Sequence, residues 1–391
     1  MLTRRALLAA AGHVGVAGAV ARLAPRGTLI AQAPGSQAWG KEQLLVRSLR
    51  PPDYETPVAL LDAFITPVEH FFVRSHLPVP TSLDAATWTL TVDGEVAAPL
   101  RLSLADLRTL PAVTVTMTLE CAGNGRSLFD PPVAGIQWGK GAVGTARWTG
   151  VRMADLLARA GAKASARNVV MNAADRPLGT MPDFTRQVPI AKAMHADTLL
   201  AYEMNGRPIP PVHGFPLRAI VPGWEGAYSV KWLTTLTVID ADFDGFWVAT
   251  AYRYPTRRVA PGAAVDPRDT APLTGLVAKS LITQPAHGAS VATGRVAVAG
   301  FAWAGETDIA SVDISIDNGA TWQPARLVGE RARYAWRRFE FAFTAPRPES
   351  CLIVSRATDA TGQMQPAVAQ WNPSGYLWNQ HDAVRVEITG A

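Results

Sequence analysis

The residues best suited to carry chemistry surround a single cysteine. Cys121 follows an alternating apolar run and opens the sequence Cys-Ala-Gly-Asn-Gly-Arg, which ends at Arg126. The two glycines let the backbone turn sharply and approach a bulky ligand. The charge of Arg126 favours a thiolate, the form in which sulfur binds a redox metal. The segment is therefore compatible with a metal-binding thiolate. Taken alone, however, a single cysteine is more often a buried apolar residue, and a nucleophile that needs a nearby histidine also remains open.

A second cluster lies upstream, in Phe71-Phe-Val-Arg-Ser-His76. Side chains alternate between the two faces of an extended segment, so Phe72, Arg74 and His76 share one face. Taken alone, the pattern favours an edge strand whose polar face is solvated, and one wall of a binding site is the alternative.

A third cluster consists of His213-Gly-Phe-Pro-Leu-Arg218 and the glycine-rich stretch 222–232. His213, Arg218 and Lys231 could all donate hydrogen bonds to phosphate oxygens, although each could also be a surface residue. Because they are grouped with glycines that permit close approach, they indicate a site for an anionic cofactor tail.

The elements that position these clusters change along the chain. Residues 34–70 are proline-rich and predicted to be irregular. Between 71 and 240, strands are expected over 88–93, 113–119 and 168–172, and helices over 103–110 and 152–160. We predict a domain of mixed sheet and short helices over residues 34–255.

Residues 256–272 are rich in proline and arginine and are predicted to be a linker. Beyond them only strand patterns occur, at 281–283, 295–301, 311–316, 338–343, 352–357 and 384–388. Short, regularly spaced strands predict an immunoglobulin-like β-sandwich over residues 273–391. Cys351 lies in one of these strands, so we expect it to be a small buried residue rather than a disulfide partner of Cys121.

The N-terminus is typical of an export signal. Residues 1–33 contain Arg4–Arg5, a dilute Ala/Gly-rich stretch and a final Ala-Gln-Ala, with no acidic residue. We therefore expect a twin-arginine signal peptide over 1–33 and a periplasmic protein without a membrane anchor after cleavage. The alternative is a cytoplasmic amphipathic helix. Without this segment, 33 basic residues stand against 32 acidic ones, so the charge gives no reason to expect nucleic-acid binding.

Six ordered motifs together resemble the sulfite oxidase family of molybdenum enzymes, and the resemblance continues to the end of the chain. They are Arg74/His76, 121–126, Gly135–Gly150, Tyr202–Gly206, His213–Arg218 and Val230–Trp232, followed by Val312–Trp322 and Trp371–Tyr376 in the second domain. The resemblance implies an α+β fold, in which a mixed-sheet molybdopterin-binding domain precedes an immunoglobulin-like dimerisation domain. It also implies a Mo-molybdopterin cofactor and a homodimer.

The same resemblance implies a role for each matching residue. Cys121 would be the protein ligand to molybdenum. Arg74, Arg126 and Trp138 would line an oxyanion pocket, for which the planar arginine fork is well suited. Tyr252 matches the active-site tyrosine, with Tyr254 close enough to remain an alternative. The expected cofactor-binding residues are Phe72, Arg74, His76, Cys121, Asp175, His213, Arg218, Lys231 and Trp232.

One departure concerns substrate preference. Animal and plant members have an arginine in the turn that here reads Trp-Asn-Pro-Ser-Gly, so Ser374 replaces a cation of the pocket. Arg253, Arg257 and Arg258 are candidate replacements. The sequence also lacks a Cys-X-X-Cys-His haem motif, which predicts electron transfer to an external carrier, most simply a c-type cytochrome.

The predicted reaction is therefore oxidation of sulfite to sulfate. Three alternatives remain open. The first is a sulfane dehydrogenase acting on protein-bound sulfur, because the motif Pro222-Gly-Trp-Glu-Gly226 resembles that branch of the family. The others are an oxidoreductase acting on methionine sulfoxide and a secreted β-sandwich binding protein without a cofactor.

Overall fold

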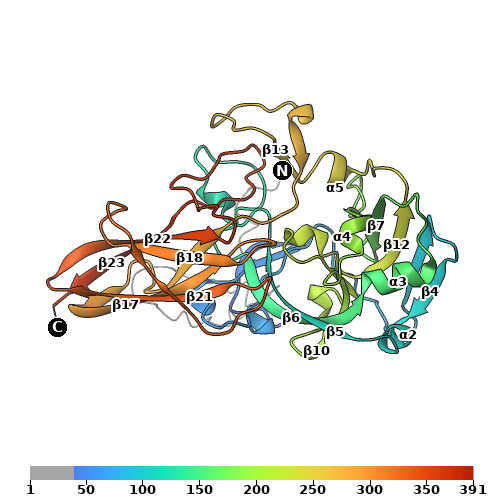
Figure 1. Ribbon diagram of the computed structural model, residues 1–391, viewed down its shortest axis with the longest axis horizontal. Coiled ribbons are helices and arrows are strands. Elements are labelled where there is room, and N and C mark those ends of the chain that lie inside the picture. Colours follow the sequence, from blue (N-terminus) through green and yellow to red (C-terminus); the bar gives the residue numbers. More distant parts are fainter. Residues whose placement is uncertain (1–38, 391) are drawn as a thin grey trace, which may run out of the picture.

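Two five-stranded sheets form the framework of the first part of the chain (Figure 1). The computed structural model describes residues 39–390, so the expected export signal at 1–33 lies outside the described residues. One sheet has the order β10-β9-β6-β5, with β11 also paired to β9. Its strands are β5 (Val113–Glu120), β6 (Val143–Arg152), β9 (Leu199–Met204), β10 (Arg207–Pro208) and β11 (Arg218–Ile220).

The other sheet is mixed, as predicted. Its order is β4-β3-β12-β7-β8, and β12 runs parallel to β3 but antiparallel to β7. Its strands are β3 (Thr89–Gly94), β4 (Leu100–Ser103), β7 (Asn168–Ala173), β8 (Arg186–Pro189) and β12 (Leu233–Ile239).

The helices of this part are short, and their ends follow from the sequence. Helix α2 (Leu104–Arg108) begins with a capping box, in which the Ser103 side chain accepts from the Asp106 N–H and the Asp106 carboxylate accepts from the Ser103 N–H. Helix α3 (Met153–Ala160) ends at Gly161, whose φ of 67° suits a residue without a side chain. The remaining helices are α4 (Ile190–Ala193) and α5 (Phe246–Ala249). Among residues 39–390, no helix has the length and apolar character needed to cross a bilayer.

The prediction that residues 34–70 are irregular was wrong for part of this segment. Strands β1 (Leu45–Leu49) and β2 (Pro52–Glu55) form an antiparallel pair. All four residues of β2 are buried, including its two acidic residues, which their residue type would place at the surface. Its Asp53 and Glu55 are buried carboxylates whose partners lie near the predicted site.

A small strand pair precedes the second part of the chain. Strand β13 (Arg253–Pro255) pairs with β14 (Thr270–Pro272). Most of the predicted linker at 256–272 is the loop that connects these two strands. Two sheets then pack face to face, with the orders β15-β17-β21-β20 and β16-β23-β22-β18-β19. The strands are β15 (Lys279–Gln284), β16 (Ser290–Ala292), β17 (Gly294–Trp303), β18 (Ile309–Ser315), β19 (Gln323–Pro324), β20 (Arg326–Val328), β21 (Arg337–Ala345), β22 (Glu349–Asp359) and β23 (Asp382–Thr389).

The predicted β-sandwich is therefore present. Its apolar core includes Ile282, Val298, Val312, Phe339 and Ile353. Cys351 is a buried, free cysteine in β22, as expected for a small apolar residue.

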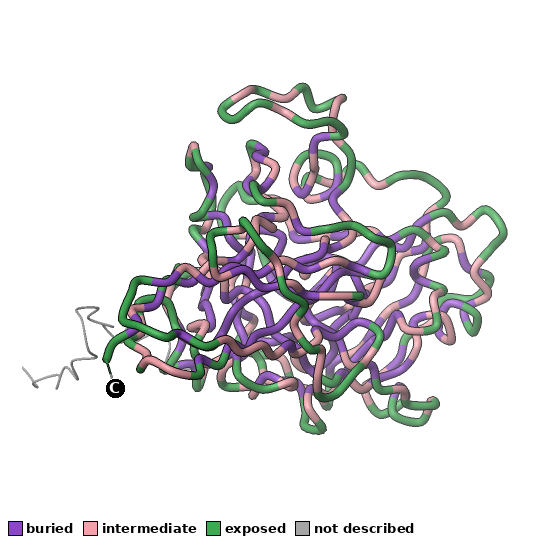
Figure 2. Tube along the Cα trace, turned by 60° about the vertical axis from the view of Figure 1, so that its left-hand side comes forward, coloured by how far each residue is buried: buried purple, intermediate pink, exposed green. Residues whose placement is uncertain are grey.

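The sandwich packs directly on β5, the strand that leads to Cys121. The Thr118 N–H donates to the Tyr334 carbonyl at 2.8 Å, and the Trp336 N–H donates to the Thr118 hydroxyl at 2.7 Å. Behind them, Lys279 forms a buried ion pair with Glu120 at 2.8 Å. Figure 2 shows that the buried residues are concentrated in the middle of the molecule. The second part of the chain thus supports the strand that ends at the predicted metal ligand.

Candidate active site

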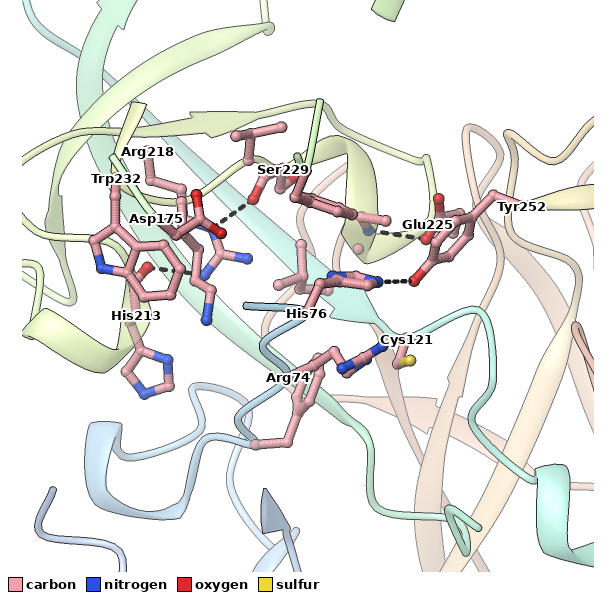
Figure 3. A pocket seen from close by; sticks show the side chains of 17 residues that line it. Arg74, His76, Cys121, Asp175, His213, Arg218, Glu225, Ser229, Trp232 and Tyr252 are labelled. Atoms are coloured by element: carbon pink, nitrogen blue, oxygen red, sulfur yellow. Dashed lines mark hydrogen bonds between the residues drawn. The ribbon is translucent and has the colours of Figure 1, made fainter. Parts of the chain in front are cut away.

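Two cavities meet at Arg74, His76, Cys121 and Tyr252, which line both of them. The inner cavity is drawn in Figure 3, where the Arg74 guanidinium points toward the Cys121 sulfur. All nine residues to which the family resemblance assigns cofactor binding line this inner cavity. Of the four expected catalytic residues, Arg74, Arg126 and Tyr252 line the outer cavity.

The Cys121 loop is held by backbone bonds and by small residues. The Cys121 N–H donates to the Ala142 carbonyl at 2.9 Å, and its carbonyl accepts from the Asn124 N–H at 2.8 Å. A Cβ on Gly123 would lie 2.6 Å from Arg126 Nη2. This glycine is therefore required for the Arg126 guanidinium to fold back over the loop.

Two opposing effects act on the protonation of the Cys121 thiol. Burial raises its pKa to about 11, and the opposing charges of Arg74 and Arg126 do not overcome that effect. The two arginines still stabilise the thiolate form of Cys121. A metal that binds the sulfur would therefore displace its proton at a lower free-energy cost than in a purely apolar pocket.

Arg74 and His76 lie on an extended segment held against β2, where Tyr54 and Val73 exchange two backbone bonds of 2.9 Å. Arg74 pairs with the buried carboxylate of Asp53 at 3.2 Å and donates to the Ser75 carbonyl. The alternative of a solvated edge strand is excluded for His76, which is buried.

His76 forms the closest polar contact at the meeting point of the cavities. Its Nε2 lies 2.5 Å from the Tyr252 hydroxyl, and its ring stacks on Phe184 at 3.9 Å between centroids. Burial, reinforced by the neighbouring Arg74 charge, lowers the pKa of His76 well below its usual range. The imidazole is therefore neutral, and its Nε2 can accept a hydrogen bond from the Tyr252 hydroxyl.

A group of basic side chains lines the far end of the inner cavity. Arg218 donates to the carbonyls of Ser229 (3.0 Å) and His213 (3.1 Å). Lys231 donates to the Ser75 hydroxyl at 2.7 Å. Burial lowers the pKa of Arg218 to about 9 and that of Lys231 well below its usual range. Buried cations that contact mainly neutral oxygens need a counter-charge, which an anionic ligand would supply.

Two further polar atoms of this cavity have no partner within residues 39–390. They are Asp175 Oδ1 and His213 Nε2, both buried. Burial also raises the pKa of Asp175 to about 6. Buried polar atoms without partners are rare in native proteins. Together with the basic group, they fit a ligand that combines an anionic end with a ring bearing donors and acceptors, as a pterin phosphate does.

The structure separates the two candidate tyrosines and removes Trp138 from the cavity walls. Tyr252 has a φ of 54° and lines both cavities, whereas Tyr254 lines neither. Trp138 is fully buried in the core next to the Cys121 loop and also lines neither cavity. Its family-derived role as a pocket residue is therefore not reflected in the geometry, although its indole N–H has no partner among the described residues.

Several site residues were not predicted from the sequence. Glu225 and Ser229 line the inner cavity, and Tyr376 lines the outer one. Glu225 pairs with Arg186 at 3.4 Å, and the Arg186 guanidinium lies over the rings of Tyr228 (4.1 Å) and Tyr252 (4.8 Å). The only available signal was that Glu225 and Tyr376 fall within segments that already carried the family resemblance.

Comparisons with known proteins agree with this geometry. Residues 76–247 match the family model of the oxidoreductase molybdopterin binding domain, and residues 271–389 match that of the Mo-co oxidoreductase dimerisation domain. Mitochondrial sulfite oxidase of Mus musculus is 40% identical over 88% of this chain, and sulfite oxidase of Arabidopsis thaliana is 32% identical over 85% of it. The match covers 66% of the mouse protein and 91% of the plant protein.

Among solved structures, the sulfane dehydrogenase SoxCD from Paracoccus pantotrophus superimposes with a TM-score of 0.74. Its sequence identity is 30%, and the match covers 86% of this chain and 85% of that one. The chain therefore belongs to the sulfite oxidase family of molybdopterin-binding oxidoreductases. Membership implies a Mo-molybdopterin cofactor, for which the inner cavity has the fitting residues.

Proposed function

We propose that the protein oxidises sulfite to sulfate and passes the electrons to an external carrier. The observation that supports this most directly is that Arg74 and Arg126 line the outer cavity together with Cys121. Two guanidinium groups beside a metal-binding sulfur form a binding site for a small sulfur oxyanion. The mouse and plant relatives carry the name sulfite oxidase.

Each residue contributes a defined function to this reaction. When bound, the molybdenum cofactor would supply oxygen-atom transfer and accept two electrons. Cys121 would hold the metal, while Arg74 and Arg126 bind and orient the anion. The Tyr252 hydroxyl, bonded to His76, holds a proton at the meeting point of the cavities. The rings stacked around it replace part of the solvent near this proton with apolar surface, which strengthens the electrostatic interactions there.

We further propose a c-type cytochrome as the electron acceptor and a homodimer formed through the β-sandwich. The cytochrome proposal rests on the lack of a haem motif in the sequence. The homodimer proposal rests on the match to a dimerisation domain. Periplasmic location remains a prediction from the N-terminal sequence.

A sulfane dehydrogenase is the second candidate, favoured by the match to SoxCD over most of both chains. Assays with sulfite, with thiosulfate and with a protein-bound sulfane distinguish these two candidates. An assay with methionine sulfoxide tests the alternative of an oxidoreductase acting on that compound. A binding protein without a cofactor would contain no molybdenum.

The decisive experiment combines metal analysis with anaerobic turnover. We expect about one molybdenum per chain and rapid reduction of ferricyanide or cytochrome c by sulfite, with much slower oxygen uptake when the carrier is omitted. Oxygen uptake as fast as carrier reduction would contradict the external-carrier proposal. Full molybdenum content without sulfite turnover would contradict the proposed reaction.

The variant Cys121→Ser tests the metal ligand. An alkoxide is a poorer donor to molybdenum than a thiolate, so we expect turnover to be abolished while the far-UV circular dichroism spectrum is retained. Sulfite turnover within about tenfold of the parent, a barrier change of only ~1.4 kcal/mol, would show that Cys121 is not the ligand.

A further inference from the structure

The outer cavity is larger than a small oxyanion requires. It encloses about 430 Å³, whereas a single water molecule needs roughly 10–15 Å³ of such space. A four-atom sulfite at the meeting point of the two cavities would leave most of the outer cavity unfilled. The lining residues Ala134, Phe246 and Thr250 are exposed, so the cavity opens to solvent beside them.

Aromatic and aliphatic side chains form the walls toward this opening. Phe246, which is 44% exposed, packs edge-to-face against Trp247 at 5.0 Å between ring centroids. Tyr252, which contacts Trp247 at 6.4 Å between centroids, stacks in turn on Tyr376 at 5.4 Å, and all of these rings line the cavity. Ile136 adds an aliphatic contact. An apolar opening is unsuited to a bare anion but suits a substituent made of carbon.

The charge of the cavity points in the same direction. Among the described residues that line it, the ionised side chains are Arg74 and Arg126. Arg74 is balanced by the buried carboxylate of Asp53 at 3.2 Å. Arg126 forms no ion pair within residues 39–390; it donates instead to the carbonyls of Ser374 (3.1 Å) and Ile136 (3.0 Å). One cation is left without a counter-charge, which matches a monoanion better than a dianion.

From these observations we infer that the outer cavity accepts organic sulfinates, R–SO₂⁻, with the R group lying between Phe246 and the Tyr252–Tyr376 pair. This inference rests on the proposed function, since it assigns the same oxidation to a second substrate class. A sulfinate carries one negative charge, a lone pair on sulfur and a carbon substituent. Its oxidation is R–SO₂⁻ + H₂O → R–SO₃⁻ + 2 H⁺ + 2 e⁻: a new S–O bond forms, the C–S bond remains, and two equivalents of a one-electron acceptor take the electrons.

The kinetic test uses the molybdenum-loaded enzyme with ferricyanide as acceptor and benzenesulfinate, methanesulfinate and sulfite as substrates. We expect kcat/KM for benzenesulfinate to be at least about one tenth of that for sulfite, and about tenfold above that for methanesulfinate, since the ring buries apolar surface in the cavity. A value for benzenesulfinate below that fraction, with sulfite turned over normally, overturns the inference and leaves the proposed function intact. Failure of both substrates at full molybdenum content overturns the proposed function as well.

Two variants and a control locate the effect. Phe246→Ala is expected to lower the benzenesulfinate-to-sulfite ratio by about fivefold to tenfold, by loss of apolar contact. Ser374→Arg adds a cation and is expected to shift the ratio about tenfold in favour of sulfite. The control Met364→Ala removes another exposed apolar side chain, on the sandwich and away from the cavity, and should leave the ratio unchanged. Ratios that change no more in the two variants than in the control overturn the inference.

A binding measurement tests the inference independently of turnover. The products benzenesulfonate and sulfate are titrated into the oxidised holoenzyme by calorimetry. We expect benzenesulfonate to bind about tenfold more tightly than sulfate, and Phe246→Ala to remove most of that difference. Equal or weaker binding of benzenesulfonate overturns the inference.

Discussion

Arg74 and Arg126 are the same residue type in different settings. Arg74 lines both cavities and balances the buried Asp53 carboxylate. Arg126 lines the outer cavity and contacts the ring of Tyr376, 5.3 Å from its centroid. Under the proposed function, Arg74 serves both the cofactor site and the substrate site, whereas Arg126 serves the substrate site alone.

This difference predicts distinct effects of Arg126→Gln and Arg74→Gln. Loss of a charge-assisted hydrogen bond of ~1.5–3 kcal/mol should lower sulfite kcat/KM about tenfold or more in Arg126→Gln, with molybdenum content retained. Arg74→Gln should lower molybdenum content as well, because it leaves Asp53 buried without its partner. Steady-state kinetics and metal analysis of both proteins test this, and equal molybdenum loss in the two would contradict it.

At the residue level the sequence predicted more of the cofactor site than of the substrate site. The nine expected cofactor-binding residues line one cavity because short motifs carry them together. Tyr376 and Arg186 could not be assigned in advance, since their roles arise only when segments far apart in sequence fold together. The effect of Arg126 on Cys121 has the predicted sign, but burial, which sequence does not show, has the larger effect on the pKa of the thiol.

Among the elements, the turn that ends at Tyr376 brings the second part of the chain into the active site. The Asn372 side chain accepts from the Tyr376 N–H at 3.0 Å and donates to the Tyr376 carbonyl at 2.9 Å. Gly375 has a φ of 61°, and a Cβ there would lie 2.3 Å from Val133 Cγ2 and 2.8 Å from Arg126 Cγ. This glycine therefore lets the turn approach Arg126.

Gly375→Ala should thus impair substrate binding beyond its effect on stability. A side chain in the left-handed region costs ~1–2 kcal/mol, and the collision with Arg126 should raise the KM for sulfite by a further factor of about ten. The matched control is Gly288→Ala, at a φ of 78° with no atom within 4 Å of the added Cβ. Thermal unfolding and KM are compared, and a KM that changes equally in both variants would contradict the role of the turn.

The elements themselves were mostly predictable where a local signal existed. The serine cap at Ser103 indicates the start of α2, and Gly161 indicates the end of α3. Strand β2 escaped prediction because it is short, begins with Pro52 and is buried on both faces. Its acidic residues Asp53 and Glu55 are of a type that is mostly exposed, so their burial could not be expected from the sequence.

At the scale of the whole molecule, a buried polar network joins the two parts of the chain behind the metal ligand. Glu120 accepts from Lys279 (2.8 Å), Trp303 Nε1 (2.8 Å) and Asn124 Nδ2 (2.8 Å). Asn124 in turn accepts from the Ala142 N–H at 3.1 Å. The strands of the sandwich thereby fix the position of the residue that directly precedes Cys121.

Lys279→Met should destabilise the protein by about 3–5 kcal/mol, because it leaves the Glu120 carboxylate buried without a cation. Molybdenum content should fall with it, since the Cys121 loop loses its support. Lys163→Met is the control: Lys163 pairs with Glu95 at 3.4 Å on the surface, and exposed pairs contribute only about 0–1 kcal/mol. Denaturant unfolding and metal analysis measure both effects, and similar losses in the two variants would refute the proposed coupling.

The origin of the outer cavity in both parts of the chain has an evolutionary consequence. The residues of the cofactor cradle at 72–232 belong to the first part, whereas Ser374 and Tyr376 reach the cavity from the second. Substitutions at 374 and 376 can therefore alter the outer cavity without changing any residue that lines the inner one. A directed-evolution library randomised at these two codons and at that of Phe246 should retain a high proportion of molybdenum-loaded clones. The substrate range of such a protein can therefore change while its prosthetic group stays the same.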